Sequence, residues 1–149
     1  MAIWLRKSTA TTIVVGPFVD SATAATPQTA LTISQSDVQL WKQGGTSFNS
    51  KTESSTATHR GNGCYTVLLD QTTDTTTNGQ LIVSINKTGC LPVRHDFEVV
   101  PSNIWDSMYG SDLLKVDVTA IGDLTNPADR LAYAAGTMIP GTIFDDGGS

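Results

Sequence analysis

The stretch from residue 63 to residue 100, GCYTVLLDQTTDTTTNGQLIVSINKTGCLPVRHDFEVV, decides the fold. It holds three short runs in which apolar and polar residues alternate, the pattern of strands with one buried and one solvated face. The residues predicted to share the buried face are Tyr65, Val67 and Leu69 in the first run, Leu81, Val83 and Ile85 in the second, and Val93, His95, Phe97 and Val99 in the third.

Turn-forming residues separate these runs. A Thr-rich connection ends in Asn78-Gly79, and Asn86-Lys87-Thr88-Gly89 lies between the last two runs. Asn and Gly tolerate the positive φ values that tight turns require. The stretch therefore predicts antiparallel β-structure, with no room for a helix.

The composition favours one small β-domain with tails. The chain has 149 residues, which fits one domain, and only 15% of them are charged, below the usual ~25%. Thr and Ser contribute 22 and 13 residues, and these types suit half-buried strands and turns.

The charge and the apolar runs exclude several classes of partner. A formal charge of −5 and a pI near 4.7 argue against non-specific nucleic-acid binding, which relies on Lys and Arg at phosphates. No run approaches the ~20 apolar residues of a membrane span. The early charges follow the apolar residues instead of preceding them, the wrong order for a secretory signal. We therefore expect folding in a cytoplasm, with no nucleic-acid or membrane partner.

The pattern extends to both sides of the central stretch. Ile13-Val14-Val15, closed by Gly16-Pro17, predicts a first strand. Residues 31–42 predict a second strand with a kink or bulge, residues 46–50 a weak strand, and residues 50–62 an exposed strand or loop. These elements define a β-sandwich domain over residues 11–110.

A short helix is predicted over residues 102–109. Ser102 is expected to cap it, Gly110 to end it, and Ile104, Trp105 and Met108 to form a face that closes one end of the sandwich. Residues 111–149 are expected to form an extended C-terminal arm with a short helix of its own, because Asn126-Pro127 is a typical helix start.

Apolar residues at both ends of the chain predict contacts with other subunits. Residues 1–10 are expected to form an N-terminal arm, and neither arm can bury its apolar residues alone. The candidate assembly contacts are Ile3, Trp4, Leu5, Leu114, Val116, Leu131, Tyr133, Met138, Ile139, Ile143 and Phe144.

Catalytic and metal-binding patterns are weak. His95 and Asp96 face opposite sides of a strand, and neither His59 nor His95 has a partner at metal-ligand spacing. The Asp70 to Asp74 loop could hold Ca²⁺, but a solvated turn is the preferred interpretation. No catalytic residue, metal or cofactor is expected.

Two further pairs of alternatives remain open from the residues. Cys64 and Cys90 are expected to be free thiols, with a cross-strand disulfide as the alternative. Trp41 and the tyrosines are expected to pack in the domain, with sugar stacking by Trp41 as the alternative.

Four segments carry a resemblance to a known group: IWLRKSTATTIVVGPFVD, LTISQSDVQLWKQGG, LDQTTDTTTNGQLIVSI and GCLPVRHDFEVVPSNIWDSMYGSD. Over residues 3–119 the chain resembles small proteins and N-terminal fibre domains encoded among the structural genes of tailed bacteriophages. The tail LKVDVTAIGDLTNPADRLAYAAGTMIPGTI is similar to the linkers that follow such domains. The resemblance implies an Ig-like β-sandwich that serves as a fibre, baseplate or head-surface accessory part.

Many relatives in this group continue into longer fibres, whereas this chain stops at Ser149. The expected function is therefore a non-enzymatic virion protein, such as a head decoration, adaptor or short-fibre subunit. It would form homo-oligomers and bind other capsid or tail proteins in the virion, after synthesis in the host cytoplasm. The alternative is a carbohydrate-binding module that contacts the host surface.

Overall fold

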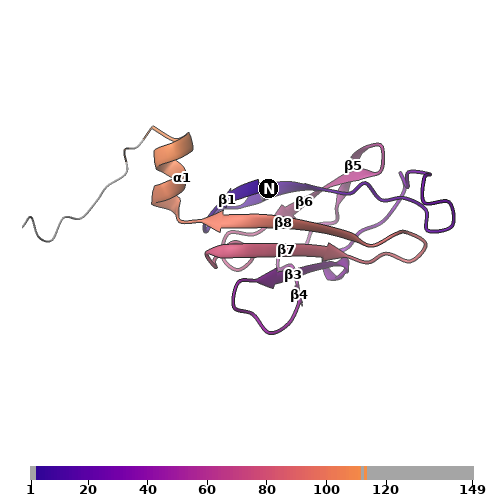
Figure 1. Cartoon of the computed structure of the whole chain (residues 1–149), viewed down its shortest axis with the longest axis horizontal. Helices are drawn as coiled ribbons and strands as arrows, with labels where there is room; N and C mark the ends of the chain where they lie inside the picture. The colour runs from indigo at the N-terminus through magenta and orange to yellow at the C-terminus, as the bar shows by residue number, and fades with distance from the viewer. Residues whose placement is uncertain (1–2, 112, 114–149) are drawn as a thin grey trace, which may run out of the picture. The chain divides into compact units, whose positions relative to one another are not determined.

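A computed structural model describes residues 3–111 and residue 113, and these residues form a mainly β structure with two sheets and one short α-helix (Figure 1). The elements are β1 (Ile3–Arg6), β2 (Thr11–Val15), the 3₁₀ helix η1 (Gln35–Asp37), β3 (Val38–Lys42), β4 (Asn49–Ser50), β5 (Thr58–Gly61), β6 (Cys64–Leu69), β7 (Gly79–Ile85), β8 (Val93–Val100) and α1 (Ser102–Tyr109).

One sheet has five strands in the order β1-β8-β7-β3-β4, and the other has three in the order β2-β6-β5. Figure 1 shows β8, β7 and β3 side by side, with α1 beyond the end of β8. All neighbours are antiparallel except β1 and β8, which run parallel with Ile3 opposite Phe97. The prediction of a purely antiparallel structure is wrong at this pair, because alternation does not encode the direction of a neighbouring strand.

The three predicted central runs are confirmed as β6, β7 and β8. However, β6 lies in the three-stranded sheet and β7 in the five-stranded sheet, so the loop between them crosses from one sheet to the other. Of these three strands, only β7 and β8 pair with each other, in a hairpin with Ile85 opposite Val93. The central stretch therefore contributes to both sheets.

The core lies between the two sheets and contains the predicted faces except for His95, which is only partly buried. From the three central strands it includes Tyr65, Val67, Leu69, Leu81, Val83, Ile85, Val93, Phe97 and Val99, which are at most 7% exposed. The hydroxyl of Tyr65 donates to the carbonyl of Gln28 at 2.9 Å and accepts from the N–H of Leu31 at 3.0 Å. Tyr65 therefore packs in the core, as predicted, whereas Tyr109 on α1 is 61% exposed.

The loop between β6 and β7 is the largest departure from the sequence predictions. The prediction of a solvated turn from Asp70 to Asp74 is wrong at its end: residues 71–73 are exposed, but Asp74 and the next residue, Thr75, are only 2% and 0% exposed. The Asp74 carboxylate accepts from the N–H of Thr52 at 2.8 Å and of Asp70 at 2.9 Å. The Thr75 carbonyl accepts from the N–H of Ser8 at 3.0 Å. The loop therefore joins two other segments that cross between the sheets.

Two predictions are wrong at the ends of secondary-structure elements. Residues 31–37 are not strand: η1 replaces the first part of the predicted 31–42 strand, and the Asp37 carboxylate accepts from the Ser34 N–H at 2.7 Å. Pro101, not Ser102, occupies the N-cap of α1, while Gly110 ends the helix as predicted. No residue of α1 is fully buried, so α1 does not plug the core.

Two further predictions concern the arms. Residues Ile3–Arg6 of the expected N-terminal arm form a strand of the five-stranded sheet. The expected C-terminal arm over residues 111–149, with its short helix, lies outside the described residues except for Ser111 and Leu113.

A buried cation stabilises the connection from β4 to β5. Lys51 is 1% exposed, and its ammonium donates to the Glu53 carboxylate at 2.8 Å. That hydrogen bond, followed by those from Ser55, lowers the pKa of Glu53 to about 2 from its ordinary 4.5. Because the folded pKa is depressed, the ion pair contributes stability above pH 4.5 and loses it as the pH falls toward 2.

We predict that Glu53→Gln lowers the free energy of unfolding at neutral pH by about 1–3 kcal/mol, because it leaves a buried ammonium without its carboxylate. Because glutamine does not titrate, the variant should also lose less of its free energy of unfolding than the parent does as the pH falls from 4.5 to about 2. Denaturant unfolding at several pH values measures both effects. Asp96→Asn is the control, because Asp96 belongs to an exposed pair and should change stability by less than about 1 kcal/mol. Equal effects of the two variants would contradict the prediction.

Candidate interaction surfaces

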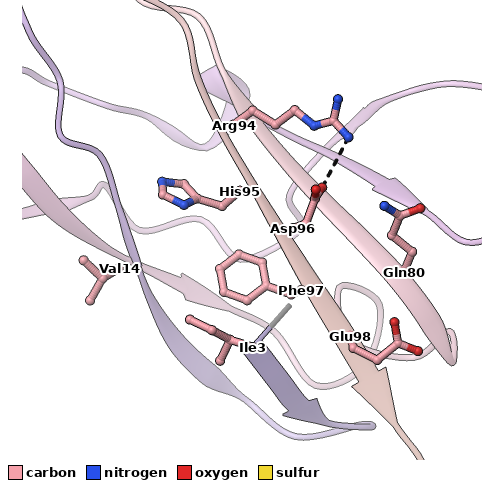
Figure 2. Close-up of a pocket in the computed structure, with 8 residues that line it drawn as sticks. All are labelled: Ile3, Val14, Gln80, Arg94, His95, Asp96, Phe97 and Glu98. Atoms are coloured by element: carbon pink, nitrogen blue, oxygen red, sulfur yellow. Dashed lines mark hydrogen bonds and ion pairs between the residues drawn. The ribbon is translucent and has the colours of Figure 1, made fainter. Parts of the chain in front are cut away.

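The first candidate surface lies beside two edge strands, β1 of the five-stranded sheet and β2 of the three-stranded sheet. We call this surface the open edge. An open pocket of about 630 Å³ lies there. Figure 2 shows its apolar residues Ile3, Val14 and Phe97, and across β8 its charged residues, which include Arg94 and Asp96. Within the described residues, β1 pairs with β8 only from Phe97 to Val100, so the pocket adjoins the part of β8 that β1 leaves uncovered.

His95 has a structural role at this pocket. Its Nε2 accepts a hydrogen bond from the N–H of Gly16 at 3.0 Å, which connects β8 to the end of β2. Figure 2 places His95 and Asp96 on opposite sides of β8, as the sequence predicts. Asp96 instead pairs with Arg94 at 3.3 Å, in an exposed contact. The imidazole acceptor is thus occupied by backbone, and no carboxylate of the described residues hydrogen-bonds to the ring.

The second candidate surface is the outer face of the five-stranded sheet. Trp4 and Trp41 alternate with the buried Leu5 and Leu40, so both indoles lie on this face. Trp41 is opposite Ile82 on β7. Its indole N–H donates to the Gly45 carbonyl at 2.9 Å, which fixes the ring. The structure therefore places the predicted assembly residue and the predicted sugar-stacking residue on one sheet face.

The third candidate surface is α1, which carries exposed apolar side chains. Met108 and Tyr109 are 55% and 61% exposed, and the Tyr109 ring centroid lies 4.5 Å from that of Trp105. The Arg6 guanidinium holds the helix beside β1 through two hydrogen bonds to Asp106, each 2.8 Å. These bonds also hold the pKa of Asp106 below its ordinary value.

The predicted assembly residues separate into three groups. Ile3 is 65% exposed and Trp4 is partly buried, and both remain on the surface. Leu5 is 5% exposed and lies in the core of this chain, because β1 joins a sheet instead of extending as an arm; it is therefore no surface candidate. The predicted residues that lie outside the described part of the chain are Leu114, Val116, Leu131, Tyr133, Met138, Ile139, Ile143 and Phe144.

Sequence reasoning missed Val14, which is 58% exposed between two buried residues, Ile13 and Val15. The period of two already marked it, because a strand buries alternate residues and an aliphatic residue on the other side faces solvent. Leu113, at 89% exposed, was missed because it lies beyond the end of α1.

The carboxylates proposed as a Ca²⁺ alternative are already engaged. Oδ1 of Asp70 accepts from the N–H groups of Thr73 at 2.9 Å and Asp74 at 2.7 Å. Burial acts to raise the pKa of Asp70, but these bonds and the one from Thr72 lower it overall. Between residues 3 and 113, the described side chains include no cluster of three or more metal-ligating groups.

A second pocket, of about 470 Å³, lies beside β3 and β4 and is lined by polar groups such as Lys42, Ser47 and Thr52. Trp41 does not line it. The stacking residue and this pocket therefore do not form one sugar site. Both cysteines are free thiols, with Cys90 buried and Cys64 partly buried.

We predict that His95→Leu lowers the free energy of unfolding by about 1–3 kcal/mol, because the Gly16 N–H loses its acceptor. His95→Gln, which keeps an acceptor oxygen, should recover part of this loss. His59→Leu is the matched control, because His59 is exposed on β5. Thermal or denaturant unfolding checks the order. A His95→Leu protein as stable as the parent would show that this hydrogen bond is dispensable.

No helix in the described part of the chain is long and apolar enough to cross a membrane. No family model, curated protein or solved structure matches the chain. The open edge, the outer face of the five-stranded sheet and α1 are therefore the features that bear on what this protein binds.

Proposed function

We propose that this chain is a non-enzymatic structural protein of a tailed-phage virion, a decoration, adaptor or short-fibre subunit that acts by protein–protein assembly. The observation that carries the proposal is the placement of large exposed apolar side chains: Ile3 and Val14 on the edge strands β1 and β2, Met108 and Tyr109 on α1, and Leu113 just beyond it. Ile3 and Val14 line one pocket, and adjoining exposed apolar residues are typical of surfaces that other proteins cover.

The charged groups support an assembly role over a catalytic one. In the part of the chain that the structure describes, four ion pairs join Arg6, Lys51, Lys87 and Arg94 to carboxylates of the same chain. His95 accepts from backbone. A catalytic acid or base needs a perturbed, accessible group beside a substrate pocket. Instead, Arg6–Asp106 and Lys87–Asp37 join segments far apart in the sequence, Lys51 is buried beside Glu53, and Arg94–Asp96 is an exposed pair on one strand.

The strand order supports the finer proposal of an Ig-like sandwich. In that fold one sheet contains strands B, E and D, and the other contains G, F, C and C′. The orders β2-β6-β5 and β8-β7-β3-β4 correspond to these strands. Two features depart from antibody domains: the thiols of Cys64 and Cys90 are free, and Trp41 on β3 lies outside the core. The proposed fold is therefore Ig-like without the inter-sheet disulfide.

The alternative function is carbohydrate binding on the outer face. It is favoured by the fixed ring of Trp41 and by its neighbours Ile82 and Gln80 on β7, which add an apolar contact and a hydrogen-bonding amide. We place it second because Trp41 is only partly exposed and the polar pocket beside β3 lies apart from it.

We predict that the full chain copurifies with density-purified phage particles, and that a chain lacking residues 120–149 folds but is lost from them. Mass spectrometry of the particles measures incorporation, and circular dichroism checks the fold. Trp41→Ala is the matched control and should incorporate normally. Normal incorporation of the truncated chain, or absence of the full chain from particles, would contradict assembly through this segment. Glycan-array binding that Trp41→Ala abolishes would favour the alternative.

A further inference from the structure

The four edge strands of the two sheets differ in how they resist pairing with another chain. β4 has two residues. β5 carries His59 and Arg60, and its register with β6 shifts at that point. β1 carries Arg6, which α1 engages through Asp106. Short length, charge, irregular register and covering elements all block edge pairing.

β2 has none of these protections. Its sequence, TTIVV, is uncharged, regular and β-branched at every position. Within the described residues it pairs with β6 alone, in an unbroken register from Thr11 to Val15. Alternate N–H and C=O groups of a strand point away from its partner, so β2 presents a row of such groups at the open edge. Val14 and the nearby Ile3 line the same pocket there.

We infer that β2 pairs antiparallel with β2 of a second copy of this chain. A two-fold axis at Ile13 would set Thr12 of each copy opposite Val14 of the other, and would join the two three-stranded sheets into one. Such a contact is isologous, so each copy supplies and receives the same strand. β-branched residues paired across strands are favourable neighbours.

A second copy suits this edge better than a charged partner strand does. The chain carries a formal charge of −5, yet β2 contains no charged residue, so pairing the two β2 strands sets no like charges opposite one another within the paired segment. One contact would also reduce the exposure of Val14 in both copies. The pairing covers few residues, so we expect a dimer of micromolar affinity, below the range of large obligate interfaces.

This inference rests on the proposed assembly function and names one of its partners, but it can be tested on purified full-length protein. Sedimentation velocity over a range of concentrations measures the mass. Val14→Lys should weaken dimerisation at least about tenfold, because each copy loses valine burial and gains a charge at the edge. Leu68→Lys is the matched control: Leu68 lies on the same sheet on β6, away from the edge, and is 37% exposed.

Hydrogen exchange gives a second readout that does not depend on a variant. We expect β2 amides that exchange quickly in dilute protein to gain protection as the dimer forms. A monomer at all concentrations, a dimer that survives Val14→Lys, or equal loss with Leu68→Lys would overturn strand pairing. A monomer that still enters particles would leave the proposed function intact, whereas a β2 dimer that never enters particles would overturn that function alone.

Discussion

The buried polar loop at Asp74 and Thr75 is the constraint on which the rest of the structure depends. The chain passes between the two sheets in four segments, β1–β2, β2–β3, β4–β5 and β6–β7. This loop lies in the last of them and also bonds the segments β1–β2 and β4–β5. Asp74 accepts from the Thr52 N–H, and Thr75 contacts Ser8 and Thr9. A buried carboxylate is tolerated only when hydrogen bonds replace its water, and the backbone supplies them here.

The crossing from β2 to β3 is fixed by a different residue, Tyr65, whose hydroxyl bonds Gln28 and Leu31. Close backbone contacts support the start of this crossing. Gly63 has a φ of +77°, and a Cβ there would come within 2.6 Å of the Phe18 carbonyl oxygen. Because these internal contacts hold the crossings, the core does not depend on the edge strands being covered. An edge strand such as β2 can therefore stay open.

Alternation was enough to predict β6, β7 and β8 and the faces they bury, because the period of two is a local property of the chain. It could not assign β6 and β7 to different sheets or β1 to a parallel pair, since these depend on contacts far apart in sequence. The same limit applies to Asp74. Its local sequence is typical of a solvated turn, and only the hydrogen bond from Thr52, 22 residues away, shows why it is buried. Among the surface residues, the period of two places Val14 on the exposed side of β2. Ile3 shares a side of β1 with the buried Leu5 and is exposed because the sheet ends at β1, an edge that the period alone cannot locate.

The crossings of this scaffold are held by internal hydrogen bonds, and its proposed interactions lie at the edges of the sheets. Amide hydrogen exchange at Ser8, Thr9 and Thr52 tests the central claim most directly, because these N–H groups donate to the buried loop. The account predicts protection close to that of the core strands β6 and β7. Exchange as fast as that of the exposed loop at residues 21–26 would show that the crossings are not held by Asp74 and Thr75, and would contradict it.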